Sequence, residues 1–206
     1  MKRTTDILGA LIGLVFLSPV LLFLAVLIRF RLGQPVFFIQ RRPGLGGKPF
    51  HLIKFRTMHN PCTADGTIFS DKRRMTRLGS FLRRTSLDEL PELFNVLKGD
   101  MSLVGPRPLL MEYLPLYTLE QRRRHEVRPG LTGWAQIHGR NDTTWEDRLS
   151  RDVWYVDHCS FLLDLRILCL TVIQVFSFKG VNASGHVTMP RFQGTAQHTG
   201  KDGEGE

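Results

Sequence analysis

The chain has 206 residues, 42% of them hydrophobic, and a formal net charge of +9. This length suits one domain with a sizeable core, or a smaller domain with a membrane element, and the hydrophobic content excludes a long disordered body. The positive charge suits nucleic acid, an anionic membrane surface or a phosphate-rich substrate as partner. No nucleic acid is expected, because the sequence holds no helix-turn-helix, zinc-finger or aromatic stacking motif. The three cysteines form no C-x-x-C pair, which is typical of a reduced compartment without structural zinc.

An apolar segment opens the chain: Lys2 and Arg3 precede a run from Ile7 to Ile28 that contains no charged residue. The run is longer than the apolar region of about 7–15 residues in a signal peptide, and long enough to cross a membrane, which takes about 20 residues. However, basic residues flank both ends, so the positive-inside bias sets no orientation. Ser18-Pro19 stands near the centre, where proline kinks a helix and the serine hydroxyl can bond a freed carbonyl. We therefore favour a re-entrant helix–break–helix segment over residues 1–33, with Ser18 and Pro19 as the break, rather than a straight span.

Membrane contact is expected at two further places. Juxtamembrane arginines favour anionic lipid headgroups by about 1 kcal/mol each near the surface, and the apolar run is followed by Arg29, Arg31, Arg41 and Arg42. The segment from Phe161 to Phe178 is strongly apolar but contains Asp164 and Arg166, which are costly in hydrocarbon. We expect a helix that lies on the membrane surface or packs in the core.

Residues 34–190 are predicted to form one catalytic domain of the α/β class, mostly α with a small β-hairpin. The hairpin is indicated by short apolar runs at Pro35–Gln40 and Phe50–Phe55, on either side of a turn rich in Gly and Pro. The last residues, 191–206, are polar and Gly-rich and are predicted to be a disordered tail.

Two helix starts carry a capping signal. Thr118 with Gln121 predicts a cap ahead of arginines 122–124, a run that fits a solvated face as well as a binding surface. The clearer case is Ser86–Lys98, where Ser86 and Glu89 form a capping box and an apolar stripe follows the 3.6-residue period. The stripe consists of Leu90, Leu93, Phe94 and Leu97.

Adjacent carboxylates, Asp88 and Glu89, lie at the start of this predicted helix. At 100° per residue Asp88 falls opposite the apolar stripe, so its side chain is expected to face solvent or a cleft. Taken alone, the pair fits a simple structural role, because acidic residues complement the dipole at a helix N-terminus.

The surroundings of the pair favour chemistry. Arg83 precedes it, and three Gly/Pro turns with single arginines follow, carrying Arg107, Arg128 and Arg140. Such turns fix the backbone while a guanidinium makes paired bonds to phosphate oxygens. Carboxylates together with substrate phosphates are the usual environment of Mg²⁺. The combination therefore predicts a site for a diphosphate and a divalent cation. Neither a P-loop nor a dinucleotide-binding glycine motif is present.

At this point the sequence resembles the monotopic phosphoglycosyl transferases, the bacterial sugar transferase family, over about residues 1 to 190. The matching stretches, in family order, are Lys2-Arg3-Thr4-Thr5-Asp6-Ile7, Ser18-Pro19, Gln40-Arg41-Arg42-Pro43-Gly44, Lys54-Phe55-Arg56-Thr57-Met58, Leu87-Asp88-Glu89-Leu90-Pro91, Asn95-Val96-Leu97-Lys98-Gly99-Asp100-Met101-Ser102, Val104-Gly105-Pro106-Arg107-Pro108 and Arg128-Pro129-Gly130-Leu131-Thr132-Gly133. The short length is similar to that of the small members that begin glycan assembly.

The resemblance implies a re-entrant membrane helix, a catalytic domain on the cytoplasmic face of the bacterial inner membrane, and Mg²⁺. It also implies a two-step transfer, in which Asp88 attacks the β-phosphate of a UDP-sugar, UMP leaves, and undecaprenyl phosphate takes the sugar phosphate from the aspartate. By the same analogy Glu89 binds the metal or assists proton transfer, and Arg107 holds phosphate. Arg56 stands at a family position that is often Lys, and Asp152 at an acidic position near the metal.

Two alternatives stay open on the sequence. A non-catalytic membrane-surface binding module would use the re-entrant helix and the basic residues, but leaves Asp88-Glu89 and the arginine turns unexplained. An enzyme with two transmembrane helices would use Phe161–Phe178 as the second helix. The charged residues Asp164 and Arg166 count against this alternative. The sugar, the glycan pathway and the oligomeric state, a homodimer included, are left undetermined.

Overall fold

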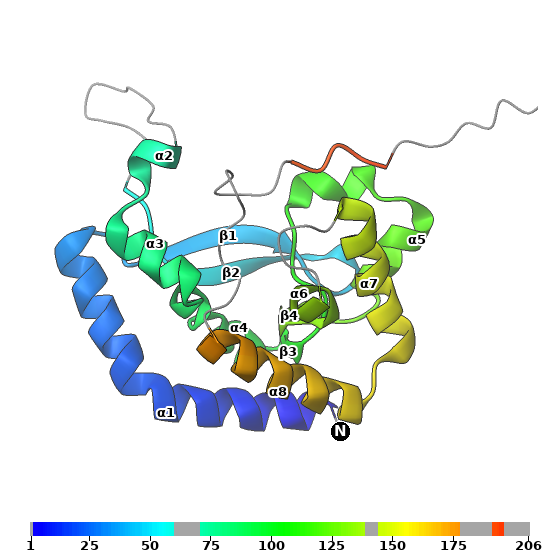
Figure 1. Ribbon diagram of the computed structural model, residues 1–206, viewed down its shortest axis with the longest axis horizontal. Coiled ribbons are helices and arrows are strands. Elements are labelled where there is room, and N and C mark those ends of the chain that lie inside the picture. Colours follow the sequence, from blue (N-terminus) through cyan, green and yellow to red (C-terminus); the bar gives the residue numbers. More distant parts are fainter. Residues whose placement is uncertain (1, 60–70, 139–143, 178–190, 196–206) are drawn as a thin grey trace, which may run out of the picture.

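The computed structural model describes residues 2–59, 71–138, 144–177 and 191–195 (Figure 1). The α-helices are α1 (Lys2–Arg31), α2 (Asp71–Arg74), α3 (Arg77–Arg84), α4 (Glu92–Lys98), α5 (Leu119–Arg122), α6 (Trp134–His138), α7 (Trp145–His158) and α8 (Phe161–Ser177). The strands are β1 (Phe37–Pro43), β2 (Pro49–Phe55), β3 (Ser102–Val104) and β4 (Gly130–Thr132). Short 3₁₀ turns are η1 (Leu45–Gly47), η2 (Leu87–Glu89), η3 (Met111–Leu116) and η4 (Arg123–His125). The predicted class, mostly helical with little β structure, is confirmed.

Helix α1 is the one element of the described chain that is long and apolar enough to cross a membrane. It runs on through Pro19 as one helix, but Figure 1 shows that it changes direction about half-way along. The Ser18 hydroxyl donates to the Val15 carbonyl at 2.8 Å, as expected beside a proline that removes a backbone donor. Many of its apolar side chains are exposed, among them Leu11, Ile12, Val15, Phe16, Leu22 and Phe23. The kink is thus present without a break in the helix.

The predicted β-hairpin is confirmed, and its strands run closer to the turn than the sequence indicated. β1 and β2 pair antiparallel from Phe37 opposite Phe55 to Pro43 opposite Pro49. Gly46 and Gly47 in the turn have φ of 62° and 74°, which favours glycine at both positions. A second sheet, in which β3 and β4 pair parallel, was not predicted, because strands of three residues leave no readable alternation.

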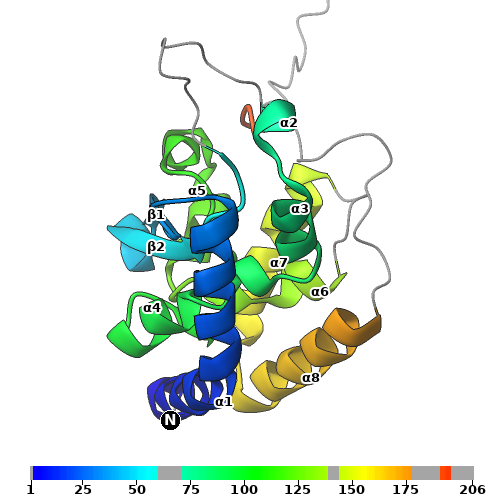
Figure 2. The same ribbon diagram turned by 90° about the vertical axis from the view of Figure 1, so that its left-hand side faces the viewer.

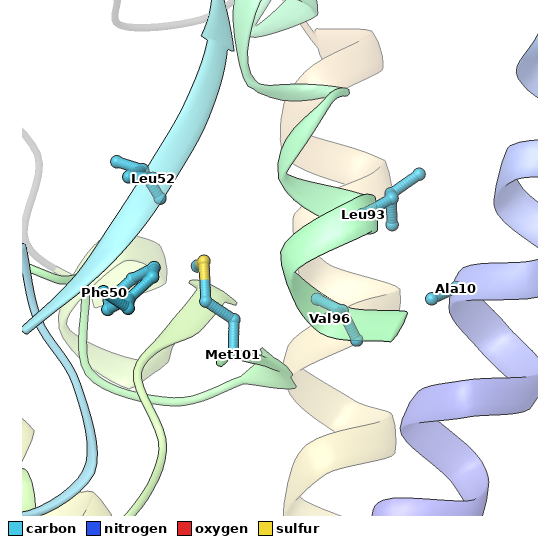
Figure 3. Close-up of a cluster of buried hydrophobic side chains, with 6 residues drawn as sticks. All are labelled: Ala10, Phe50, Leu52, Leu93, Val96 and Met101. Carbon is cyan, nitrogen blue, oxygen red and sulfur yellow. The ribbon is translucent and has the colours of Figure 1, made fainter. Parts of the chain in front are cut away.

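The core beneath the hairpin joins β2, α4 and α1 (Figure 3). Phe50 and Leu52 of β2 face Leu93 and Val96 of α4, and Ala10 of α1 packs on the far side of that helix. The small Ala10 side chain lets the two helices approach closely. This packing fixes α4, and with it the turn that precedes α4, against the hairpin.

The single helix predicted over Ser86–Lys98 is wrong in its first half. Residues Leu87–Glu89 form the 3₁₀ turn η2, and α4 begins only at Glu92, after Pro91. Ser86 has φ of 56° and its side chain caps nothing, so the predicted capping box is absent. Proline is tolerated in the first turn of a helix, but here the α-helix starts after Pro91 rather than running through that residue. Gly99 ends α4 in the left-handed conformation, as predicted.

The first turns of α1 are held by polar contacts to the folded domain. Lys2 Nζ lies 2.5 Å from Asp164 Oδ2 of α8 and donates to the Tyr155 hydroxyl at 3.1 Å. Arg3 donates to the Val96 and Leu97 carbonyls at the end of α4. Both views show the first half of α1 and α8 at the same end of the molecule, away from the hairpin (Figures 1 and 2). The predicted helix after Phe161 is confirmed, and it buries Ile167 while Leu162, Val172 and Ile173 are exposed.

Two expectations for the rest of the domain are corrected. Arginines 122–124 do not form a uniform solvated face, because Arg124 is 2% exposed and paired with Asp152. Phe192 belongs to a buried cluster with Leu109, Tyr113, Tyr117 and Leu149, so packing continues past residue 191, where the tail was predicted to begin. The capping box of Thr118 and Gln121 is confirmed. The end of the predicted tail, residues 196–206, lies outside the described residues.

Asp6 provides a test of how the first half of α1 is held. It is 4% exposed, and its Oδ1 accepts from the Ser102 hydroxyl and from the Leu103 amide, each at 2.9 Å. Asp6→Ala would leave both donors unsatisfied, which costs about 1–3 kcal/mol per buried group. We expect its thermal unfolding midpoint in detergent to fall by several degrees, as about 1 kcal/mol shifts a domain of this size by about 2–4 °C. Asp6→Asn keeps the accepting oxygen, so its unfolding midpoint should fall by less than that of Asp6→Ala. Equal midpoints for Asp6→Ala and the wild type would contradict this role.

Candidate active site

The acidic pair lies in the 3₁₀ turn η2, between α3 and α4 and beside strand β2. Asp88 is 8% exposed, whereas Glu89 is only partly covered. The expectation that Asp88 faces a cleft or solvent fails in its simple form, since it assumed one regular helix. The turn instead directs the two neighbouring side chains into different surroundings.

Glu89 is held by two cations from distant parts of the chain. Lys54 Nζ of β2 donates to its Oε1 at 2.7 Å, and Arg107 donates to Oε2 at 3.1 Å and also to Oε1. Burial alone would raise the pKa of Glu89, but the charges of Arg107 and Lys54 outweigh it and hold that pKa well below its usual range. Glu89 is therefore ionised, and both of its oxygens are already engaged.

Asp88 differs in having no hydrogen-bond donor on its carboxylate among the residues that the structure describes. Burial raises its pKa, and the charge of Glu89 raises it further, while Lys54, Arg83 and Arg107 act in the opposite direction. No α-helix starts at Asp88, so its ionised form is favoured by the charges of the three cations rather than by a helix dipole. Asp88 is thus the unpaired carboxylate of the two.

Lys54 also faces a third carboxylate, Glu92, which the sequence analysis did not select. Lys54 Nζ lies 2.9 Å from Glu92 Oε1, yet the angles do not make a hydrogen bond, and this buried oxygen accepts none among the described residues. Burial raises the pKa of Glu92 to about 7, and the neighbouring charge of Glu89 contributes, although Lys54 opposes it. A signal for Lys54 existed: the two-residue period of a strand places it on the same face as the buried Phe50 and Leu52.

Arg107 reaches the site from a loop fixed by close backbone contacts. Parallel pairing of β3 with β4 brings Gly105 against Gly130, where a Cβ on Gly130 would lie 2.0 Å from the Gly105 nitrogen. Only glycine allows this approach. The next residues are held by Arg124, which donates to the Arg107 carbonyl at 2.7 Å. The glycines of these predicted turns therefore serve packing, which in turn positions the guanidinium of Arg107.

Asp152, predicted as a metal ligand, accepts from Arg124 Nε at 3.1 Å and Nη2 at 2.7 Å and is 2% exposed. It is not gathered with Asp88 and Glu89 into one cluster. Within the described residues, no group of three or more His, Cys, Asp or Glu side chains is placed to hold a metal ion. The structure therefore gives Asp152 a different partner, the guanidinium that supports the Arg107 loop.

The other predicted arginines fall into two groups. Arg83 stays near the pair: its Nε donates to Thr57 at 3.0 Å, and its charge acts on Asp88. Arg56 donates to two backbone carbonyls, that of Gln34 at 2.6 Å and that of Met58 at 2.8 Å. Arg128 likewise donates to the Gly99 carbonyl at 2.9 Å. Arg140 lies outside the described residues.

The site so assembled contains one buried, unpaired carboxylate among three cations, beside a paired carboxylate that holds two of those cations. Fixed cations of this kind stabilise the negative charge of phosphoryl groups. An unpaired carboxylate within their field can act as a nucleophile or as a metal ligand.

Comparison with known proteins agrees with this chemistry. The family described as bacterial sugar transferase matches residues 1–178. EpsL of Bacillus subtilis, named an uncharacterized sugar transferase, is 55% identical over 195 residues, covering 95% of this chain and 96% of EpsL. The exopolysaccharide production protein ExoY of Sinorhizobium fredii is 39% identical over 196 residues, covering 87% of each chain.

A longer relative carries a more specific name. The UDP-glucose:undecaprenyl-phosphate glucose-1-phosphate transferase of Xanthomonas campestris is 43% identical over 191 residues, which are 86% of this chain and 39% of that protein. The chain thus spans nearly all of EpsL and about two fifths of the Xanthomonas protein. Because the family match covers the chain from before α1 to just beyond α8, the chain belongs to the bacterial sugar transferase family.

Proposed function

We propose that this protein transfers a sugar 1-phosphate from a UDP-sugar to undecaprenyl phosphate and releases UMP, as an early step in the assembly of a bacterial glycan. The reaction is the one named for its relative in Xanthomonas campestris. It agrees with the phosphate chemistry of the site and with an apolar helix that can meet a lipid substrate. The sugar is left open, since the relatives that match nearly full length are not named for one.

The observation that carries the mechanism is the contrast between the two neighbouring carboxylates. Glu89 has both oxygens bound by Lys54 and Arg107, whereas Asp88 accepts no hydrogen bond within the described chain. A carboxylate that is already paired is a poor nucleophile, because attack would break its ion pairs. We therefore assign the nucleophile to Asp88.

The proposed reaction then has two displacements at the same phosphorus. An oxygen of Asp88 forms a bond to the β-phosphorus, and the bond from that phosphorus to the bridging oxygen breaks, so UMP leaves with the electron pair. An oxygen of the lipid phosphate next attacks the same phosphorus and restores the Asp88 carboxylate. Neither step requires a proton to move, because both attacking groups are anions. Glu89 serves as a positioning residue that holds Lys54 and Arg107, rather than in proton transfer.

Mg²⁺ is proposed as the cofactor, with a smaller set of protein ligands than the sequence suggested. Mg²⁺ in phosphate sites uses one or two carboxylates together with substrate phosphates, and Asp88 is a carboxylate that fits this use without losing a partner. Asp152 would have to leave Arg124, and Glu89 would have to leave Lys54 or Arg107. The bound metal would offset negative charge on the diphosphate.

For the membrane we propose the re-entrant arrangement, with the catalytic domain on the cytoplasmic face. Support comes from contacts at both ends of α1. Its first turn is tied to α8 through Lys2 and Asp164, and its last turns bury Leu24 and Ile28 against Phe55 and Leu82. Two ends held by the same domain favour the same side of the membrane, and the exposed apolar middle of the helix is the part left for lipid.

The first test concerns the nucleophile. Incubated with a UDP-sugar labelled in the sugar and no lipid acceptor, the wild type should retain label covalently, and mass spectrometry should locate the sugar phosphate on Asp88. Asp88→Asn should lose both steps, with a rate loss of at least about 10³-fold. Label on Glu89, or turnover of the donor without trapped label, would show that the nucleophile is misassigned or the transfer direct.

A stability measurement serves as the control for Asp88→Asn. Since burial raises the pKa of Asp88, its charge destabilises the folded state at any pH above the unfolded-state pKa, about 3.9. The variant should therefore unfold at a higher temperature than the wild type at neutral pH, and the difference should vanish at strongly acidic pH. An inactive but more stable variant separates lost chemistry from lost folding.

The second test concerns the metal. Excess chelator should abolish release of UMP by the purified protein, and added Mg²⁺ should restore it, because Asp88 and the substrate phosphates are proposed to share the ion. Ca²⁺ at the same concentration is the matched control, since its longer bonds fit a different geometry. Full activity in excess chelator would remove Mg²⁺ from the mechanism.

The third test concerns topology. In a background without the native cysteines, single cysteines at Thr4 and Gly33 should both react with an impermeant thiol reagent from the cytoplasmic side only. Replacing Pro19 with Ala should straighten α1 and favour spanning. Reaction of the two positions from opposite sides in the Pro19-containing protein would establish a spanning helix instead.

A further inference from the structure

Arg42 resembles Arg83 in that no carboxylate pairs with it among the described residues. It projects from β1 and is half-buried, with Nε and Nη2 on the Gln40 side-chain oxygen at 3.1 and 2.7 Å and Nη1 on the Pro108 carbonyl at 3.4 Å. Within the described residues it forms no ion pair, whereas Arg107 is paired with Glu89 and Arg124 with Asp152. The two contacts of Arg42 with Gln40 stay within strand β1, and the third, with Pro108, joins Arg42 to the Arg107 loop. The expectation that Arg42 meets lipid headgroups stays a prediction.

The surroundings of Arg42 are unfavourable for a bare cation. Burial lowers the pKa of Arg42, and the charge of Arg107 lowers it further, against weaker opposition from Glu92 and Glu112. Burial and then the charge of Arg107 also lower the pKa of Arg148 of α7. Arg42 and Arg148 therefore both lie within the field of Arg107. A partly buried charge of this kind is stabilised when an anion binds to it.

The contacts of Arg42 relate it to Arg107. Its Nη1 donates to the carbonyl of Pro108, the residue after Arg107, so the Arg42 side chain lies against the Arg107 loop. The charge of Arg107 acts both on Arg42 and on Asp88. Arg107 is therefore part of the electrostatic surroundings of both residues.

We infer that Arg42 binds the phosphate that stays with the leaving nucleotide, next to the phosphate that Asp88 attacks. The inference rests on the proposed function. In a nucleoside diphosphate the two phosphorus atoms share one bridging oxygen, so Arg107 and Arg42 hold successive phosphates of the donor. The guanidinium has five N–H donors, of which three are used in the contacts above, so two are free for phosphate oxygens. As the bridging bond breaks, charge grows on this phosphate, and Arg42 stabilises the departing UMP.

The test uses binding of uridine, UMP and UDP, measured by titration calorimetry on the detergent-solubilised protein. Arg42→Gln should weaken the binding of UMP and of UDP by about the same factor, tenfold or more, because a hydrogen bond to a charged group contributes about 1.5–3 kcal/mol. Uridine, which has no phosphate, should bind equally to both proteins. The matched control is Arg41→Gln, an exposed neighbour on the same strand, which should bind UMP as the wild type does.

The outcomes separate this inference from the proposed function. If Arg42→Gln fails to fold, Arg42→Lys serves instead, because it keeps the charge without the planar fork of the guanidinium. Arg42→Lys should weaken UMP binding by less than the tenfold expected for Arg42→Gln. Unchanged UMP affinity in a folded Arg42 variant would overturn the inference. If that variant instead showed only a raised KM for the lipid acceptor, Arg42 would serve the lipid phosphate and the inference would again be wrong. A wild type that binds neither UMP nor UDP would overturn the proposed function, and this inference with it.

Discussion

The ion pairs of Glu89 are the constraint on which the site depends. They join Lys54 of strand β2 and Arg107 of the loop after β3 to the turn between α3 and α4. Three segments that are far apart in the sequence thus meet at one carboxylate. Removal of one partner would leave an uncompensated charge in a partly buried site. The cations around Asp88 are therefore held in place before any substrate arrives, which is what electrostatic catalysis requires.

Around this centre, paired and unpaired charges alternate in a way that suits phosphate transfer. Glu89 and Asp152 each neutralise an arginine and support the Arg107 loop. Glu89 holds the side chain of Arg107, and Asp152 holds Arg124, which in turn donates to the Arg107 backbone carbonyl. Asp88 and Arg42 each have no ionic partner in the described chain. Unpaired buried charges weaken a fold and are retained where a ligand needs them. This contrast between neighbours is more informative than the acidity or basicity of the region as a whole.

The sequence was a good guide wherever one local pattern decided the outcome. The apolar run with Pro19, the hairpin turn with its glycines, and the caps at Thr118 and Gly99 each depend on a few adjacent residues. It failed where a contact across the chain overrode the local pattern. Ser86 is left-handed and is followed by a 3₁₀ turn that lies beside β2, and Phe192 is buried by aromatic residues some 50 to 80 positions earlier.

The same distinction applies to the candidate site. The structure brings together Asp88, Glu89 and Arg107, which the spacing had selected. Spacing could not tell which of the arginines donate to backbone carbonyls. Arg56 and Arg128 bind carbonyls, while Lys54, without an assigned role in the sequence analysis, is at the centre of the acidic group. These differences depend on which atoms lie within about 3 Å, and that is set by tertiary packing.

The contact between Lys2 and Asp164 has a consequence for how the protein is made. The two residues are separated by 162 positions, so the partner of the first turn of α1 leaves the ribosome after most of the domain. The apolar helix emerges first and cannot complete its polar contacts until α8 exists. Contacts of such high sequence separation form late, because the loop between them must be closed. Attachment of the first described helix to the domain therefore waits until the last described helix has been synthesised.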